Sequence, residues 1–137
     1  MINPWKKADS KEEAEQISGI RFPDILPLFL PGSMKDASYF CMRGLIEARY
    51  ADSLGNRLIL RKTNQETDRL SGDYSTYPAE YDCELKGTIL RCKGTNDRIN
   101  TAEFTAYTCF FSIVMNPGQP GRGLTADQLS ALAEQFL

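Results

Sequence analysis

Apolar residues recur at every second position over much of the stretch from Phe40 to Cys92. A strand turns successive side chains to opposite faces, so this period indicates strands with one apolar side and one solvent-facing side. In the first run, the residues predicted to share the apolar face are Phe40, Met42, Gly44, Ile46, Ala48 and Tyr50. The pattern continues at Leu58 and Leu60, at Tyr81, Cys83 and Leu85, and at Leu90 and Cys92. An antiparallel sheet that is apolar on one side is therefore the main prediction for the fold.

Two helices are expected to cover the apolar side of this sheet. Ser10 and Thr125 are each followed three residues later by Glu or Gln, which is the spacing of a capping box at a helix N-terminus. Gly19 is placed to end the first helix in the left-handed conformation. The last helix carries an apolar stripe formed by Leu129, Leu132, Ala133 and Phe136. Such a stripe favours packing on an apolar surface, and the sheet offers one.

Together these elements predict an α+β fold with a single antiparallel sheet of about six strands in a meander, one face covered by the N-terminal and C-terminal helices. The expected strand spans are 38–50, 57–63, 80–86, 88–93, 98–104 and 108–115. A chain of 137 residues with a charged fraction of 25% is typical of one globular domain. We therefore assign residues 1–137 to a single domain.

Three connections are long for a chain of this size. Residues 19–38 contain three prolines, which favour extended backbone and predict a segment that drapes over the core. Its expected apolar anchors are Ile20, Phe22, Ile25, Leu28 and Phe29. Residues 63–78 are polar, and residues 116–123 are rich in glycine and proline. Long loops in compact domains are often functional, which directs attention to these segments.

One hairpin can be predicted residue by residue. Gly87 followed by Thr88 suits a two-residue type II′ turn, which favours glycine at its first position. That register gives the pairs Lys86–Ile89, Leu85–Leu90, Glu84–Arg91 and Cys83–Cys92. Glu84 and Arg91 would then form a cross-strand ion pair. The two thiols would be neighbours, reduced in the cytoplasm but able to form a disulfide in an oxidising compartment.

Charge and hydropathy argue against two kinds of partner. The net charge is −2, so the overall field repels polyanions, and we expect no nucleic-acid partner. No apolar run reaches the roughly 18 residues that span a bilayer, and we expect no membrane span. The N-terminal segment lacks the pattern of a signal peptide, which predicts a cytoplasmic protein. A chain trimmed from a longer exported protein would have the same sequence, so that alternative stays open.

The chain contains no histidine, which removes the commonest base for nucleophilic catalysis and a common zinc ligand. Its four cysteines, which form no C-x-x-C pair, are Cys41, Cys83, Cys92 and Cys109. Most of them lie in apolar, strand-like contexts, where a cysteine packs as a small apolar side chain. The sequence also lacks a phosphate-binding glycine loop and a dinucleotide motif. We therefore predict no catalytic residue, no metal site and no cofactor.

The order of short motifs along the chain resembles an uncharacterised bacterial domain family. The segment Asn3-Pro4-Trp5 is similar to the N-terminal signature of that family, and Ser71-Gly72-Asp73-Tyr74 is similar to its most distinctive segment. Members of the family include small stand-alone proteins and exported lipoproteins. Phe104 stands where a tryptophan is usual, and the cysteines are not part of the pattern. The resemblance implies a one-domain fold and implies no reaction.

The polar side of the predicted sheet carries the most suggestive residues for function. Arginine clusters bind carboxylates and phosphates through paired hydrogen bonds. The plain alternative is a solvated face whose ion pairs contribute little. The predicted partner-binding residues are Arg43, Arg49, Arg57, Arg61, Asp73, Tyr74 and Tyr77. We expect a small non-enzymatic module that binds a protein or peptide through this face and the 63–78 loop.

Two other functions stay open. One is an enzyme of unfamiliar type that uses carboxylates, tyrosine or lysine in a cleft between residues 63–78 and residues 116–123. A pocket where Asp73 and Glu103 converge, or a carboxylate of strongly raised pKa, would favour it. The other is a self-associating domain that pairs through an exposed edge strand.

Overall fold

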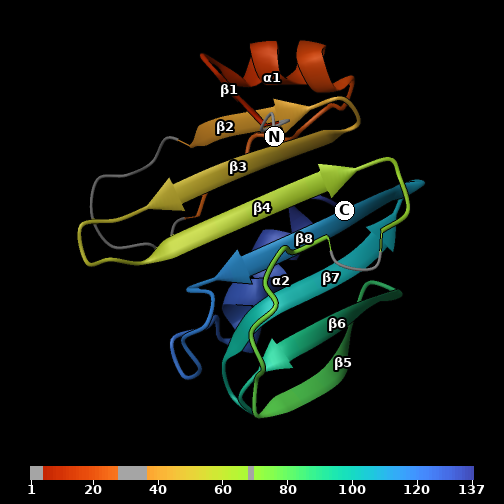
Figure 1. Cartoon of the computed structure of the whole chain (residues 1–137). Helices are drawn as coiled ribbons and strands as arrows, with labels where there is room; N and C mark the ends of the chain where they lie inside the picture. The colour runs from red at the N-terminus through yellow and green to blue at the C-terminus, as the bar shows by residue number, and fades with distance from the viewer. Residues whose placement is uncertain (1–4, 28–36, 68–69) are drawn as a thin grey trace.

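The computed structural model describes residues 5–27, 37–67 and 70–137. It contains one open antiparallel sheet of eight strands in the order β1-β2-β3-β4-β8-β7-β6-β5 (Figure 1). The strands are β1 (Lys6–Ala8), β2 (Ser38–Met42), β3 (Leu45–Ala51), β4 (Arg57–Thr63), β5 (Ala79–Leu85), β6 (Thr88–Gly94), β7 (Ile99–Ala106) and β8 (Cys109–Met115). The helices are α1 (Lys11–Ser18) and α2 (Ala126–Glu134). The predicted α+β class with a single antiparallel sheet is confirmed.

The number of strands differs from the expected six because the predicted strand 38–50 is a hairpin. Gly44, with φ 81°, lies in the tight turn between β2 and β3, and Cys41 faces Ile46 across it. The turn shifts the alternation, so Phe40 lies opposite Glu47 rather than sharing a face with Ile46. The prediction that Phe40 and Met42 lie on the apolar side is therefore wrong. The remaining additional strand is β1, which pairs with β2.

The strands do not form one meander. β1 to β4 form one run of sequential neighbours, and β5 to β8 form another. The two runs meet where β4 pairs with β8 along its length. The chain reaches β5 through residues 64–78, and the described part of this crossing loop, residues 64–67 and 70–78, passes in front of the sheet to its far edge (Figure 1). Because of this long connection, β5 lies at the far edge of the sheet, and β8 takes the place beside β4 that β5 would occupy in a meander.

The predicted helix ends are confirmed. The Ser10 side chain accepts a hydrogen bond from the Glu13 amide at 3.1 Å, and Gly19 ends α1 in the left-handed region with φ 75°. At α2, the Thr125 and Gln128 side chains and backbone amides form both bonds of a capping box. These ends follow from local hydrogen bonding alone, because Ser10 and Thr125 satisfy backbone amides that the helix leaves unpaired, and the Gly19 amide satisfies the carbonyl of Glu15.

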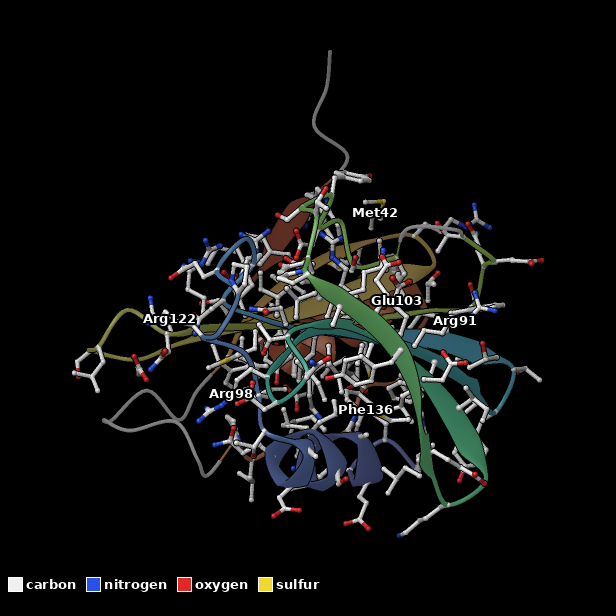
Figure 2. The ribbon with its side chains drawn as sticks, turned by 90° about the horizontal axis from the view of Figure 1, so that it is seen from below. Met42, Arg91, Arg98, Glu103, Arg122 and Phe136 are labelled. Carbon is white, nitrogen blue, oxygen red and sulfur yellow. The ribbon has the colours of Figure 1, made fainter. Side chains whose placement is uncertain are left out.

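The core lies between the apolar side of the sheet, α2 and residues 20–25. Phe22, Phe104 and Phe111 each place an aromatic ring within about 6 Å of the ring of Phe136 from the end of the chain. The predicted anchors Ile20, Phe22 and Ile25 are buried, while Leu28 and Phe29 lie outside the described residues. Figure 2 shows Phe136 beside α2, with Met42 on the opposite side of the sheet. α1 packs at the other end, against β1 and β2, and its Ala14 is fully buried.

The β5–β6 hairpin turns one residue earlier than predicted. Lys86 and Gly87 have φ values of 50° and 80°, which is the signature of a type I′ turn centred on these two residues. Leu85 therefore faces Thr88, Cys83 faces Leu90, and Asp82 rather than Glu84 faces Arg91. The type II′ turn, its register and the Glu84–Arg91 ion pair were wrong. The sheet faces are unchanged, because moving the turn by one residue changes the pairing register by two residues.

All four cysteines are free thiols. Cys92 is buried and lies diagonally across from Cys83, because it faces Tyr81. Burial raises the pKa of the Cys92 thiol, and the adjacent Cys83 thiol raises it further. Within residues 5–27, 37–67 and 70–137, no group of three potential metal ligands comes together, and no helix is long and apolar enough to cross a bilayer.

Candidate functional site

A single row of polar side chains crosses the side of the sheet that faces away from α2. The strand register aligns one residue from each of six neighbouring strands along a line perpendicular to the strands. From β3 to β5, the members of this transverse row are Glu47, Arg61, Ser112, Glu103, Arg91 and Asp82. Opposite charges thus face each other at both ends of the row, which favours cross-strand attraction.

The β3–β4 end of the row is buried. Glu47 is only 1% exposed and forms ion pairs with Arg49 and with Arg61, the latter at 2.5 Å. The Arg61 guanidinium lies 5.2 Å from the ring of Trp5, and that of Arg49 lies 3.7 Å from the ring of Phe40. Aromatic rings and the crossing loop therefore exclude water from a pair that the sequence pattern placed in solvent. Glu47 is therefore buried although it lies on the polar side of the sheet.

Residues 70–73 of the crossing loop sit directly on the row. The Arg61 Nη1 atom donates a hydrogen bond to the Leu70 carbonyl at 2.9 Å, and Leu70 itself is buried. Gly72, with φ 68°, lies so close that an added Cβ would be 2.7 Å from Arg61 Nη1. Glycine suits the left-handed conformation at this position, and a side chain here would displace the Arg61 guanidinium. Arg61 holds the loop as well as the strand below it.

A second attachment point of the loop is the Asp73 cluster, formed by Asp73, Tyr77, Thr101 and Gly118. The Asp73 carboxylate accepts hydrogen bonds from the hydroxyls of Tyr77 and Thr101, and the Tyr77 hydroxyl accepts one from the Gly118 amide at 2.7 Å. Burial opposes ionisation of Asp73, but the hydrogen bonds from Tyr77, Ser75 and Thr101 outweigh it and lower its pKa. The cluster ties the loop to β7 and to the loop that precedes α2.

The other end of the transverse row, formed by Glu103, Arg91 and Asp82, lines a groove of about 860 Å³ beside the crossing loop. Its charged lining residues are Glu66, Asp82, Arg91, Lys93 and Glu103. Ile89, which is 53% exposed, and the half-buried Phe110 add apolar surface. Figure 2 shows Arg91 and Glu103 on the side of the sheet opposite to α2. The groove therefore combines both signs of charge with exposed apolar contacts.

Glu103 is the titratable group in this groove whose protonation the fold changes most clearly. Burial raises its pKa, although the cations of Lys93 and Arg91 and a hydrogen bond from the Leu70 amide oppose that effect. A carboxyl group with a higher pKa in the folded protein binds its proton more tightly there than in the unfolded chain. The folded state consequently loses relative stability as the pH rises above the ordinary glutamate pKa.

We therefore expect Glu103→Gln to raise the free energy of unfolding at pH 7 and to leave it unchanged below about pH 4, where the wild-type carboxyl is protonated. Urea denaturation of both proteins at several pH values measures the difference. Glu84→Gln, which removes a carboxylate from an exposed position of β5 outside the groove lining, is the control. A Glu103→Gln effect that is the same at both pH values would contradict this account.

The predicted partner-binding residues are dispersed rather than gathered. Arg49 and Arg61 are paired with Glu47, whereas Arg43 in the β2–β3 turn and Arg57 at the start of β4 are exposed. Tyr77 is buried in the Asp73 cluster, and Tyr74 is 69% exposed. The described residues that line the groove include none of the seven predicted ones, which are Arg43, Arg49, Arg57, Arg61, Asp73, Tyr74 and Tyr77.

The groove residues that sequence analysis missed are chiefly Glu66, Asp82 and Lys93. A signal for two of them was present, because charged residues alternate in β5 and β6. Their meeting with Glu103 depends on the strand order, which the alternation does not contain. Asp73 and Glu103 do not converge in one pocket, because Asp73 is held in its own cluster outside the groove.

Comparisons of this chain with protein-family models, curated proteins and solved structures found no match. The family resemblance carried by the sequence motifs thus stays a prediction.

Proposed function

We propose that this protein is a small non-enzymatic module that binds an extended segment of a partner protein in the groove beside the crossing loop. The observation that carries the proposal is the groove itself, about 860 Å³ in volume and lined by charged and apolar side chains together. Concave sites of this size with a few charged groups are typical of specific recognition. Mixed lining of this kind suits a peptide, which offers both side-chain types.

The surroundings of the groove support a preformed site. Arg61 and the Asp73 cluster attach the crossing loop at two separate points, so its wall is fixed before a ligand arrives. Preorganisation reduces the conformational entropy lost on binding. Arg61, first considered for recognition, thus has a supporting role in this proposal. Among the described residues, Arg91 is the arginine that lines the groove.

Selection from a random-peptide phage library on the immobilised protein tests the proposal. Thr105 is exposed and lines the groove, so Thr105→Trp places a large side chain in it. Gln16→Trp makes a comparable change at an exposed position of α1 and serves as the control. Enriched peptides should bind wild type and Gln16→Trp equally and Thr105→Trp about tenfold more weakly. Absence of enrichment, or equal binding to all three proteins, would refute the proposal.

A second candidate function is an enzyme in which Glu103 acts as a general acid or base. The raised pKa of this groove carboxyl favours it, because such groups suit proton transfer near neutral pH. Chromogenic ester, phosphate and glycoside substrates provide a direct assay. Turnover that Glu103→Gln abolishes would support the enzyme, and turnover that survives the substitution would exclude this role for Glu103.

A further inference from the structure

The two edges of the sheet differ in how well they are closed. β1 is only three residues long, and α1 packs beside it. β5 is seven residues long, and in the described part of the chain it pairs with β6 alone. A full-length edge strand presents unpaired backbone amides and carbonyls that another strand can complete. β5 is thus the open edge of this sheet.

The hairpin register identifies which β5 residues present those free backbone groups. In a two-residue hairpin the pair that flanks the turn, here Leu85 and Thr88, is hydrogen-bonded, and such pairs alternate along the ladder. Glu80, Asp82 and Glu84 therefore direct their amides and carbonyls outward, away from β6. Their side chains are exposed on the side of the crossing loop. Every outward-facing backbone position in this stretch thus carries a carboxylate.

Neighbouring cations do not neutralise this edge fully. Lys93 lies 3.5 Å from Glu80, and Arg91 faces Asp82, but Glu84 faces the apolar Ile89. Lys86, next along the chain, pairs with Glu134 of α2 at 3.4 Å instead. The edge therefore retains net negative charge towards its turn end.

The other side of β5 is apolar and only half covered. Tyr81, Cys83 and Leu85 pack against the margin of the core, and each of them is partly buried. A strand added beyond β5 would cover these side chains with its own apolar residues. The edge thus favours an occupant that alternates between cationic and apolar residues.

We infer that the free edge of β5 accepts an extended segment of a partner protein as an additional strand, with Lys or Arg at alternate positions facing Glu80, Asp82 and Glu84. This inference goes beyond the proposed groove, because the free edge of β5 carries it independently, and it names the chemistry of the peptide. Asp82 belongs both to the edge and to the groove lining, so a long cationic side chain at the edge also reaches the groove. The backbone bonds give affinity, and the charges select the sequence.

A second copy of this chain does not fit the same edge. Antiparallel pairing of two β5 strands about Asp82 would place Asp82 opposite its counterpart and Glu80 opposite Glu84. Like charges directly opposite each other are destabilising. A shift by one residue would instead place carboxylates opposite apolar side chains. The occupant is therefore a different, basic segment.

Three synthetic peptides of the length of β5 test the inference by isothermal titration calorimetry. One alternates lysine with valine, and one alternates glutamate with valine. The third is the lysine peptide N-methylated at its lysine amides, which are the amides that would face β5. The lysine peptide should bind, and the other two should bind about tenfold more weakly or not at all. Equal binding of the glutamate peptide or of the N-methylated peptide would overturn the inference.

Matched variants separate the edge from general charge attraction. Asp82→Lys reverses a charge on the edge, and Glu12→Lys makes the same change in net charge at an exposed position of α1. Binding of the lysine peptide should fall about tenfold with Asp82→Lys and remain at the wild-type level with Glu12→Lys. An equal loss with both variants would overturn the inference.

The two proposals fail in different ways. If phage-selected peptides bind in a manner that Thr105→Trp disrupts while the lysine peptide does not bind, the groove stands and the edge inference is refuted. If the lysine peptide binds but the library yields nothing that depends on the groove, the proposed groove is refuted and strand addition at β5 stands by itself. Failure of both assays refutes both proposals.

Discussion

Arg61→Met should lower the free energy of unfolding by about 3 kcal/mol, because it leaves the carboxylate of Glu47 buried with one of its two cations removed. The Glu47 side chain is 1% exposed, so water cannot replace the lost partner. The change also removes the hydrogen bond to the Leu70 carbonyl, which holds the crossing loop. Urea denaturation measures the loss of stability.

Arg57→Met provides a matched control, because Arg57 lies on the same strand and face but is exposed. Its effect on the free energy of unfolding should stay within about 0.5 kcal/mol. Equal losses for the two variants would show that the Glu47–Arg61 pair contributes no more than a surface contact. Amide hydrogen exchange in residues 70–77 should increase in Arg61→Met and stay unchanged in Arg57→Met, because only Arg61 contacts the loop backbone.

Gly123→Ala should also destabilise the protein by about 3 kcal/mol, because an added Cβ would lie 2.4 Å from the backbone of Ile99. Ile99 and Leu124 exchange two backbone hydrogen bonds, both at 2.7 Å, next to this contact. That bridge fixes the start of α2 against β7, so a shift there disturbs the position of the helix over the core. Thermal and urea denaturation measure the effect.

Gly121→Ala is the control in the same loop. Gly121 has φ 86° with open space around it, so alanine costs only the strain of the left-handed conformation, about 1–2 kcal/mol. If Gly121→Ala proves as destabilising as Gly123→Ala, the close approach to Ile99 has no energetic importance. A Gly123→Ala protein with wild-type stability would lead to the same conclusion.

Features of the fold that depend on local interactions were predictable from the sequence. Both ends of α1 and the start of α2 follow from Ser10, Gly19 and Thr125, each of which acts within a few residues of its own position. The apolar strands at Leu58–Leu60 and Leu90–Cys92 follow from alternation, because that pattern reports directly on which face of a strand is buried.

The β2–β3 turn was hidden by apolar residues on the polar side of the sheet. Phe40 and Met42 continue the period of Ile46 and Ala48 although the turn at Gly44 places them on the other face. On that face Phe40 is covered by another side chain, because the Arg49 guanidinium packs on its ring. Alternation of apolar residues therefore indicates that a side chain is covered, but it does not show whether that side chain lies on the core side of the sheet or on the opposite side.

The candidate site was the least predictable part, because it is made by strand order. Glu103 meets Arg91 on one side and Ser112 on the other only because β7 lies between β6 and β8. The polar composition of residues 64–78 likewise hides the burial of Leu70 and Tyr77 beneath a hydrophilic exterior. Strand order and the packing of a loop on the sheet depend on residues far apart in the sequence, so the local hydrophobic pattern does not predict them.

The pairing of β4 with β8 has a consequence for how the chain folds. Within each run of four strands, neighbours in space are neighbours in sequence, so each half requires the closure of short loops only, apart from the connection that precedes β2. The seam between the halves joins residues 57–63 to residues 109–115 and closes the longest stretch of chain in the sheet. Non-local contacts of this kind slow folding. The β4–β8 seam is therefore the pairing in this sheet that we expect to slow folding most.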